Sequence, residues 1–436
     1  MVLFLHNRYR TTGGEEQAVE DLAWLVSARL GEPASVLTTS SAALSRGQAA
    51  AGLLRGGLNP ERVGQAVRDA EARVVHAHNL QPAFGWRALA AARAAGARTI
   101  LHLHQYRLVC AIGVCFTRGA ECTRCHGRNT LPGVRLNCRG SLAEAVLYGA
   151  SLAAWQRRLL EQADALIVPS VFARERLRAL GAPLPWERVH VIAPLVRALD
   201  GEATDAAMND AASNDTSVNH AASSDTSVND AAANEAHAGG PGAHPPDAGE
   251  PAAGRPAAGR PAAGRPYALV ASRLAPEKGV EVAIEACALA GIELVIAGDG
   301  PEAHELRVRA KDSGGAVRFA GRVGASELAR LRAGAAVALA PSRSPETFGL
   351  ALAEAMAAGV PVVASRVGAL PELVEEAGLA PAGDARALAA LIEQRAGDRA
   401  AGERGRRRVR SVCAPGVVAE ALAEVYERGG APARRT

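Results

Sequence analysis

The chain has 436 residues, of which 48% are hydrophobic and 3% aromatic, and its formal net charge at pH 7 is +4. A chain of this length suits two domains that each bury a core. The charge is uneven, because residues 1–196 carry 23 Arg and no Lys against 14 Asp and Glu. No helix-turn-helix, finger or aromatic–basic pattern accompanies this excess, so a nucleic-acid partner is not expected. The excess fits an anionic membrane surface, a phosphate-bearing acceptor, or simply the solvated surface of an Arg-rich protein.

No run of about 20 apolar residues is present, so the sequence predicts no membrane-spanning helix. The first residues, MVLFLHNRYRTTGG, lack the long apolar stretch of a signal peptide. We therefore expect a cytoplasmic protein, either free or bound peripherally to the inner face of the cell membrane. In this compartment the seven cysteines are more typical of thiols or metal ligands than of disulfides.

Strand-like and helix-like segments alternate through residues 1–196, which we predict to form the first domain. Short apolar runs predict strands at Val2–Leu5, Ala34–Thr38, Arg73–Ala77, Arg98–His102, Ala165–Val168 and Val189–Ala193. Helical patterns lie at Pro60–Ala72, Phe84–Ala95, Leu142–Ala163 and Phe172–Leu180, and a further helix follows a turn at Gly13–Gly14. This alternation is typical of a parallel, doubly wound sheet.

The alternation stops between Arg197 and Arg265. A ten-residue unit, Ala211–His220, is followed by a near-copy at Ala221–Asp230, and PAAGR then occurs three times in tandem. Such repeats carry too little apolar surface to fold. Residues 197–265 are therefore predicted to be a disordered linker between domains, and a docking tail is the alternative interpretation.

A second domain is predicted at residues 266–412, where the alternation resumes. The predicted strands are Tyr267–Ser272, Ile292–Ala297, Ala316–Phe319, Val337–Ala340 and Val360–Ser365. The predicted helices are Gly279–Leu289, Glu302–Lys311 and Gly349–Ala358. Residues 413–436 form a last segment, in which Pro415–Glu427 is helical.

Two glutamates flank the predicted start of the helix at Gly349–Ala358. Glu346 lies in the loop before this helix, and Glu354 lies on its second turn. A helix N-terminus attracts anions through its free N–H groups and its dipole. The two glutamates can therefore bind opposite ends of an extended ligand that carries phosphate in its middle. The alternative is an ordinary helix–strand unit with two solvated carboxylates.

The stretch PETFGLALAEAMAAGVPVVAS, residues 345–365, resembles the E-x7-E signature of retaining family-4 glycosyltransferases of the GT-B fold. The resemblance implies that Glu346 binds hydroxyls of a donor sugar and that Glu354 binds the nucleotide ribose. It also implies that the backbone N–H groups of Phe348, Gly349 and Leu350 hold the diphosphate of a nucleotide-sugar donor.

Two further motifs of the second domain resemble the same family. SRLAPEKG, Ser272–Gly279, follows the first predicted strand, and the resemblance implies that Arg273 and Lys278 hold the diphosphate. The chain has only two lysines, Lys278 and Lys311, so a lysine in this loop indicates a site that does not accept arginine. Gly298 and Asp299 belong to a GDGP turn, which in the family lies beside the nucleotide base. Two cations would balance the diphosphate, so no catalytic metal cofactor is expected.

The first domain carries weaker parts of the resemblance. Gly14 belongs to the turn that in the family closes on the donor phosphate, and His104 stands where the family has a histidine near the donor sugar. His102 is expected to be buried, and VVHAHN at Val74–Asn79 to line the cleft. IAPLV at residues 192–196 replaces the usual IPNG-type turn. The resemblance further implies that the final helix crosses back onto the first domain.

Five cysteines cluster between residues 110 and 138. The spacing of Cys110, Cys122, Cys125 and Cys138 suits a closed structural zinc site, while plain thiols or disulfides are the alternatives. The segment resembles a Cys-rich insertion in a subset of family-4 enzymes, in which these four align and Cys115 is additional.

The sequence as a whole predicts a GT-B architecture, with two Rossmann-like domains facing across a cleft. The implied activity is retaining transfer of a hexose-type sugar from a nucleotide-diphospho-sugar to a glycan or lipid-linked acceptor in cell-surface polysaccharide biosynthesis. Two alternatives remain open. A GT-B epimerase or hydrolase would need no acceptor, and a non-catalytic scaffold would bind the nucleotide sugar without turnover.

Overall fold

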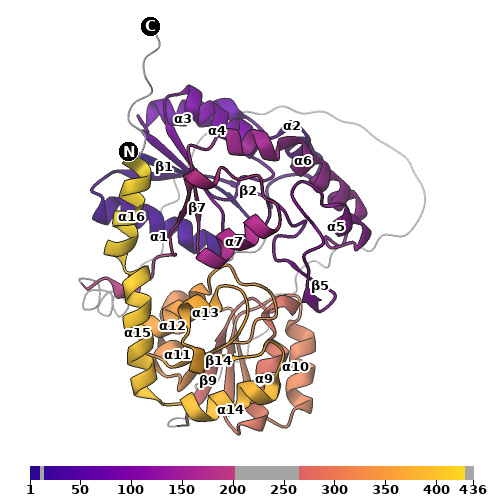
Figure 1. Cartoon of the computed structure of the whole chain (residues 1–436), viewed down its shortest axis with the longest axis vertical. Coiled ribbons are helices and arrows are strands. Elements are labelled where there is room, and N and C mark those ends of the chain that lie inside the picture. The colour runs from indigo at the N-terminus through magenta and orange to yellow at the C-terminus, as the bar shows by residue number, and fades with distance from the viewer. Residues whose placement is uncertain (10–13, 202–264, 428–436) are drawn as a thin grey trace, which may run out of the picture.

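The computed structural model describes residues 1–9, 14–201 and 265–427. Within them the chain forms two α/β domains that face each other, the first in the upper half of Figure 1 and the second in the lower half. Most of the predicted linker, residues 197–265, lies outside the described residues. Its first residues differ from the prediction, because Arg197–Leu199 forms a 3₁₀ turn and Val196 and Leu199 pack into a core cluster of the second domain.

The first domain is built on a six-stranded, wholly parallel sheet in the order β2-β1-β3-β4-β7-β8. Its strands are β1 (Val2–Arg8), β2 (Ala34–Ser40), β3 (Val74–Ala77), β4 (Arg98–His102), β7 (Ala165–Val168) and β8 (Val189–Val191). The helices are α1 (Gly14–Arg29), α2 (Arg46–Arg55), α3 (Pro60–Asp69), α4 (Gly85–Ala94), α6 (Leu142–Glu161) and α7 (Val171–Ala179). The order is doubly wound and reverses direction between β1 and β3.

The second domain has another six-stranded parallel sheet, in the order β11-β10-β9-β12-β13-β14. Its strands are β9 (Tyr267–Ala271), β10 (Glu293–Ala297), β11 (Val317–Gly321), β12 (Val337–Ala340), β13 (Val362–Ser365) and β14 (Leu379–Ala380). The helices are α9 (Val280–Leu289), α10 (Ala303–Asp312), α11 (Ala325–Ala333), α12 (Leu350–Ala357), α13 (Leu370–Leu373) and α14 (Ala385–Arg395). This is the Rossmann order, which reverses between β9 and β12. The predicted α/β fold with two parallel sheets is confirmed.

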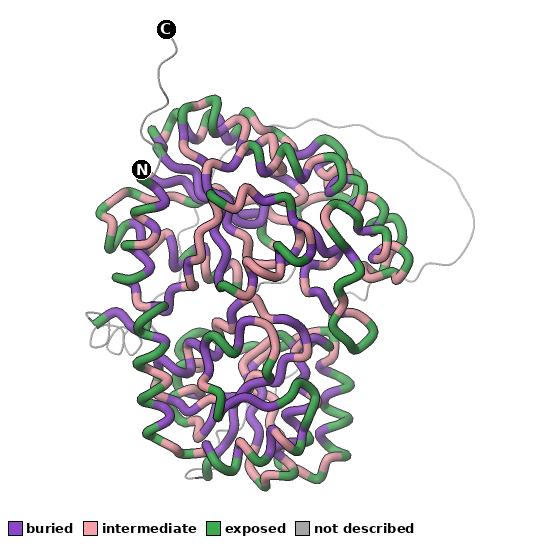
Figure 2. Tube along the Cα trace, in the orientation of Figure 1, coloured by how far each residue is buried: buried purple, intermediate pink, exposed green. Residues whose placement is uncertain are grey.

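The sheets are covered on both faces, so their strands read as short continuous apolar runs rather than alternating ones. β3 and β7 are buried at every position, and the buried segments follow the strands through the middle of each domain in Figure 2. None of the described helices combines the length and the apolarity that crossing a membrane requires.

The last two helices connect the domains. α15 (Arg399–Cys413) packs beside α12 in the second domain, and α16 (Pro415–Glu427) then runs along the first domain beside α1 (Figure 1). Leu422 and Tyr426 of α16 share a core cluster with Phe4 of β1 and Leu25 of α1. The final helix therefore completes the core of the domain that begins the chain.

The cysteine-containing segment adds small elements that the sequence pattern did not indicate. They are a hairpin of β5 (Phe116–Thr117) and β6 (Ala120–Glu121) and a short helix α5 (Leu131–Arg135). β5 extends toward the second domain in Figure 1. There Arg343 Nη2 donates a hydrogen bond of 2.7 Å to the carbonyl of Gly119, so this hairpin is one of the contacts between the domains.

Buried histidines form a stack inside the first domain. His76 of β3 and His102 of β4 share a hydrogen bond of 3.3 Å, and the other ring nitrogen of His76 lies 2.7 Å from the Tyr426 hydroxyl of α16. Burial, together with the neighbouring His104, lowers the pKa of His76 to about 3, and burial holds the pKa values of His78 and His102 well below 6.5. These imidazoles are therefore neutral in the folded protein.

Truncating Leu422 to Ala is expected to destabilise the first domain by about 2–5 kcal/mol, because the side chain is fully buried and its removal leaves a cavity. Urea unfolding followed by circular dichroism measures the change. Val417→Ala is the matched control on the same helix, since Val417 is 43% exposed, and its cost should stay within about 0.5 kcal/mol. Equal effects of the two variants would contradict the packing described for α16.

Acid is expected to destabilise the fold through the histidine stack. The folded-state pKa of His76 lies below its ordinary value of 6.5, so the unfolded chain binds protons that the folded chain does not. Stability should then fall progressively as the pH drops from about 6.5 toward 3. Urea unfolding across this range measures the slope. His102→Gln should reduce the slope by up to one proton, because burial holds the pKa of His102 well below 6.5. A slope unchanged in His102→Gln would contradict the assignment.

Candidate functional site

The loops after β9 and β12 meet at the point where the strand order of the second sheet reverses. Open α/β sheets bind their ligands at such points, beyond the carboxyl ends of the strands. Lys278, from the loop after β9, donates through Nζ to Glu346 Oε1 at 2.7 Å. Ser342, from the loop after β12, donates to the same oxygen at 2.6 Å. The structure thus brings together two residues that the sequence placed in separate motifs.

Glu346 is held as a carboxylate although its side chain is only 16% exposed. Burial alone would raise its pKa, but the charge of Lys278 and the hydrogen bonds from Lys278 and Ser342 outweigh that effect and lower the pKa. The site therefore holds a charged pair beneath the interface between the domains.

Close backbone packing fixes these loops. Gly279 has a φ of 63°, and a Cβ there would lie 2.1 Å from the carbonyl oxygen of Pro341. Gly298, in the turn after β10, has a φ of 149°, and its Cβ would lie 1.8 Å from the carbonyl oxygen of Ser272. Only glycine fits either position. The three predicted motifs of this domain are thus packed directly against one another.

Two predicted residues of these loops lie beside the central pair. Arg273 forms an ion pair with Glu277 in its own loop, and 53% of its side chain is exposed. Asp299 accepts a hydrogen bond of 2.8 Å from the N–H of Gly300, which fixes the turn after β10. Arg273 therefore keeps an accessible guanidinium, whereas Asp299 is partly committed to its own turn.

The predicted anion site begins α12. Gly349 is the residue before the helix, and its first helical residue is Leu350. The ring of Phe348 packs into the core, so the contribution of this residue to a ligand would come from its backbone N–H. Glu354, on the next turn, forms an ion pair with Arg332 of α11. Burial raises the pKa of Glu354, while Arg332 opposes the rise.

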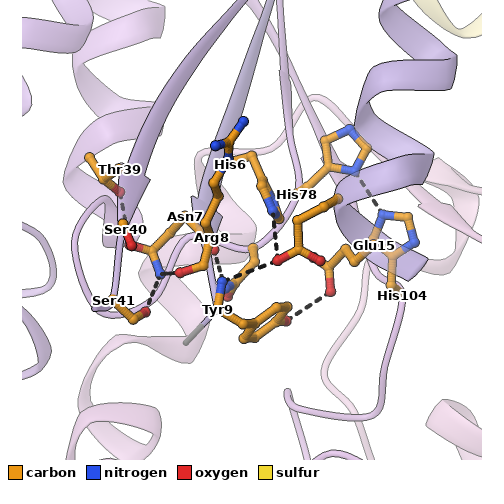
Figure 3. Close-up of polar contacts among 12 residues, drawn as sticks. His6, Asn7, Arg8, Tyr9, Glu15, Thr39, Ser40, Ser41, His78 and His104 are labelled. Atoms are coloured by element: carbon orange, nitrogen blue, oxygen red, sulfur yellow. Dashed lines mark hydrogen bonds and ion pairs between the residues drawn. The ribbon is translucent and has the colours of Figure 1, made fainter. Parts of the chain in front are cut away.

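The first domain presents a second group of polar residues at the carboxyl ends of β1, β3 and β4. The Tyr9 hydroxyl donates to Glu15 Oε2 at 2.8 Å, and His104 Nε2 shares a hydrogen bond of 2.7 Å with His78 Nδ1 (Figure 3). These four residues line a cavity of about 100 Å³. Gly14 is the first residue of α1, next to Glu15, and Gly13 lies outside the described residues.

The two groups meet at Thr347. Its hydroxyl donates to the backbone carbonyl of His104 at 3.0 Å, and its own carbonyl accepts from the Ser170 hydroxyl at 2.7 Å. Glu346 and His104 were predicted from opposite halves of the chain. Thr347, which follows Glu346 directly, therefore links the two through its bond to His104. Nearby, Glu372 of α13 accepts a hydrogen bond of 3.1 Å from the N–H of Val171 at the start of α7.

Two sets of residues could be considered for a metal. Within the described ranges, the one group of three potential ligand atoms within 4.8 Å of one another is His76, His78 and His102. These rings are stacked with interplanar angles of 14–29°, so their in-plane lone pairs run side by side rather than converging on one ion. The second set is the predicted cysteines. Cys110, Cys122, Cys125 and Cys138 line a cavity of about 10 Å³, and Cys115 lines it with them.

Several residues of the site were not predicted from the sequence. Ser342 lies four residues before Glu346, and its place in the same polar loop could have indicated it. Tyr9 and Glu15 flank the predicted glycine turn. Thr347 is inside the recognised motif, but its role depends on the other domain. Arg332 is 22 residues from Glu354 on another helix, and no spacing rule connects the two.

Two family models match the chain. One is described as "Glycosyl transferase 4-like domain" and matches residues 2–194, and the other is "Glycosyl transferases group 1" and matches residues 256–409. The chain is 40% identical over 104 residues to a GDP-mannose-dependent alpha-mannosyltransferase of Corynebacterium glutamicum, which is 24% of each protein. It is 38% identical over 122 residues to a phosphatidyl-myo-inositol mannosyltransferase of Mycobacterium leprae, covering 26% of this chain and 32% of that protein.

A further relative is the amylovoran biosynthesis glycosyltransferase AmsK of Erwinia amylovora, which is 37% identical over 139 residues, or 28% of this chain and 34% of that protein. These matches span about a quarter to a third of the length of the curated relatives.

Solved structures resemble the whole fold. Sucrose-phosphate synthase from Thermosynechococcus elongatus has a TM-score of 0.62 at 19% identity, with 98% of each chain covered. HepE from Anabaena in complex with UDP and glucose has a TM-score of 0.58 at 17% identity, with 97% of this chain and 98% of that chain covered. The two family models divide between the two domains, and both neighbours share the two-domain architecture. The chain belongs to the family-4 glycosyltransferases of the GT-B fold.

Proposed function

We propose that the protein is a retaining glycosyltransferase that moves a hexose-type sugar from a nucleotide-diphospho-sugar to an acceptor hydroxyl. The observation that carries the proposal is the half-buried Lys278–Glu346 pair. Thr347, the next residue in the chain, bonds the backbone of His104 in the opposite domain. A carboxylate to orient sugar hydroxyls and a cation for phosphate are thus held together between two domains.

Each of these charged residues can form hydrogen bonds to a ligand in addition to those that it forms within the protein. The Lys278 ammonium has three N–H donors, so it can keep Glu346 and still donate to a diphosphate. A carboxylate has about four acceptor positions, so Glu354 can bind ribose hydroxyls while it stays paired with Arg332. Arg273 and the N-terminus of α12 supply further positive potential for the diphosphate.

The reaction would follow from this arrangement. The bond between the anomeric carbon and the diphosphate oxygen breaks, and the acceptor oxygen bonds to that carbon on the same face of the sugar. The proton of the acceptor hydroxyl passes to the departing diphosphate. The diphosphate departs with the electron pair and is stabilised by Lys278, Arg273 and the first turn of α12. Glu346 positions the sugar and is not assigned as a nucleophile. Because these groups carry the charge, we propose no metal cofactor for the transfer itself.

The nature of the donor is supported by the relatives. Two of them are mannosyltransferases, one of them GDP-mannose-dependent, and the structural neighbour HepE was solved with UDP and glucose. Both observations favour a nucleotide-linked hexose. A thermal-shift screen with UDP-, GDP- and ADP-hexoses, with and without chelator, would identify the base.

The acceptor is proposed to be a glycan or lipid-linked molecule at a membrane surface. The large cavity of the first domain is lined by apolar side chains as well as by Tyr9 and His104, among them Leu53, Leu80, Trp86, Leu152 and Trp155. Exposed apolar residues lie on the neighbouring helices α2, α5 and α6, namely Leu54, Leu131, Leu142 and Val146. With the Arg-rich first domain, this surface favours peripheral contact with an anionic cytoplasmic membrane face and a role in cell-surface polysaccharide biosynthesis.

Product analysis separates this function from its rivals. Incubation with the hexose nucleotide that shifts the melting temperature and with a membrane lipid extract should yield a glycosylated lipid or glycan with retained anomeric configuration. Free sugar or an epimerised nucleotide as the sole product would instead identify a hydrolase or an epimerase. Binding without any turnover would identify a scaffold.

Replacing Glu346 with Ala is expected to lower kcat at least about tenfold, since it removes a charge-assisted hydrogen bond to the sugar of about 1.5–3 kcal/mol. Steady-state kinetics with the preferred donor measures the change, and a melting curve checks that the variant is folded. Glu305→Ala is the matched control, because Glu305 lies on the exposed face of α10. A kcat unchanged in folded Glu346→Ala would remove this residue from the site.

Lys278→Arg is expected to weaken donor binding even though the charge is conserved. The Nζ atom donates to Glu346 from a close-packed loop, and the broader guanidinium cannot occupy the same position. Calorimetric titration of the nucleotide sugar should show at least a tenfold higher Kd. Lys311→Arg changes the other lysine of the chain, which is exposed on α10, and serves as the control. Wild-type affinity in Lys278→Arg would show that the site needs only a positive charge.

A further inference from the structure

Five cysteines separated by up to 28 residues line one small cavity in the first domain. Cys110, Cys115 and Cys125 are at most 8% exposed, and Cys122 and Cys138 are half-buried. The cavity has a volume of about 10 Å³, which is close to the space that a single water molecule needs. This volume is of the size that a single ion occupies.

One cysteine of the cavity has an unusual backbone conformation. Cys115 has a φ of 50°, a left-handed backbone conformation that residues other than glycine rarely adopt. It is fixed there by a hydrogen bond of 2.8 Å from the N–H of Cys122 to its carbonyl, across the β5–β6 hairpin. A strained residue that the surrounding structure holds in place is typical of a functional constraint.

This segment has little else to hold it together. Its regular structure consists of a hairpin with two residues in each strand and the five-residue helix α5. Both residues of β6 are exposed, and in the strands of the hairpin only Phe116 of β5 is buried. Small, loop-rich segments of this kind need a covalent or metal crosslink to stay ordered.

Four of the five thiols form two pairs. The thiols of Cys110 and Cys115 share a hydrogen bond, and Cys122 and Cys125 have the C-x2-C spacing of zinc ligands. The thiol of Cys138 has a different partner, because it donates to Thr117 Oγ1 at 3.7 Å. The geometry therefore separates Cys138 from the other four, whereas the sequence pattern separated Cys115.

We propose that Cys110, Cys115, Cys122 and Cys125 bind one Zn²⁺ as a structural tetrathiolate site. Four sulfur ligands around a single ion are typical of zinc in proteins. Zn–S bonds of about 2.3 Å place the sulfurs of a tetrahedral site about 3.8 Å apart. No three of these sulfurs lie within 4.8 Å of one another in the described chain. Binding must therefore draw the loops inward and close the cavity around the ion.

The consequence of this site extends to the other domain. The hairpin between Cys115 and Cys122 carries Gly119, whose carbonyl accepts the hydrogen bond from Arg343, and Phe116, whose ring centre lies 5.7 Å from the Arg343 guanidinium carbon. Arg343 adjoins Ser342, which bonds Glu346. The ion would thus fix a hairpin that contacts the loop of the charged pair, and it has no catalytic role.

Metal analysis of the full chain, purified under reducing conditions without chelator, tests the site independently of enzymatic activity. Mass spectrometry of the native protein and elemental analysis should show one zinc per chain. The variants Cys110→Ser, Cys115→Ser, Cys122→Ser and Cys125→Ser should each release zinc to a chromogenic chelator at least tenfold faster, while Cys138→Ser should match the wild type. Zinc retained in Cys115→Ser but lost in Cys138→Ser would overturn the proposed ligand set.

A second measurement covers the case in which a serine variant fails to fold. Wild-type protein exchanged into Co²⁺ should show intense thiolate-to-cobalt charge-transfer absorption and the strong visible bands of a tetrahedral site. Hydrogen exchange in residues 110–138 should accelerate when chelator removes the metal. A native mass lower by two hydrogens for each cysteine pair, without metal, would identify disulfides and overturn the proposal, as would a metal-free protein with the full thiol mass.

Discussion

The arrangement of the site depends on keeping one carboxylate charged beneath an interface between two domains. Taking Glu346 out of water favours its protonated form, and Lys278 with Ser342 reverses that preference. The partners come from loops after two different strands, so the pair exists only where the sheet order reverses. The close contacts at Gly279 and Gly298 leave no room for a side chain between these loops. The charge and the backbone packing therefore support the same geometry.

The contacts between the domains are concentrated around this pair. Thr347 bonds His104 and Ser170 of the first domain, Glu372 bonds the first turn of α7, and Arg343 bonds the cysteine-containing hairpin. All of them come from loops or short helices at the carboxyl ends of the second sheet. A change in how the domains sit would therefore be felt first at Glu346 and His104.

The sequence was most informative where the chain is most regular. The strands at Arg98–His102, Ala165–Val168 and Val337–Ala340 and the helix at Pro415–Glu427 have the bounds that periodicity indicated, because buried parallel strands and a packed helix have strong patterns. α2, α11 and α15 were not predicted, since their Ala- and Arg-rich sequences contain few large apolar residues. The motif residues around Glu346 were recognised, but the partners that set its charge and position come from elsewhere in the chain. Long-range pairs such as Arg343 with Gly119 leave no local signal.

The hydrogen bond between Tyr426 and His76 has a consequence for the order in which the protein can be assembled. His76 lies in the middle of the first sheet, yet its hydroxyl partner and the apolar cover of the neighbouring strands come from α16. A ribosome therefore completes the second domain before the first can close its core. Until α16 packs, the apolar face that it will cover and the His76 imidazole remain exposed to water. Chaperones and proteases can act on such a surface. The stability of the first domain therefore depends on α16, which is synthesised only after the second domain.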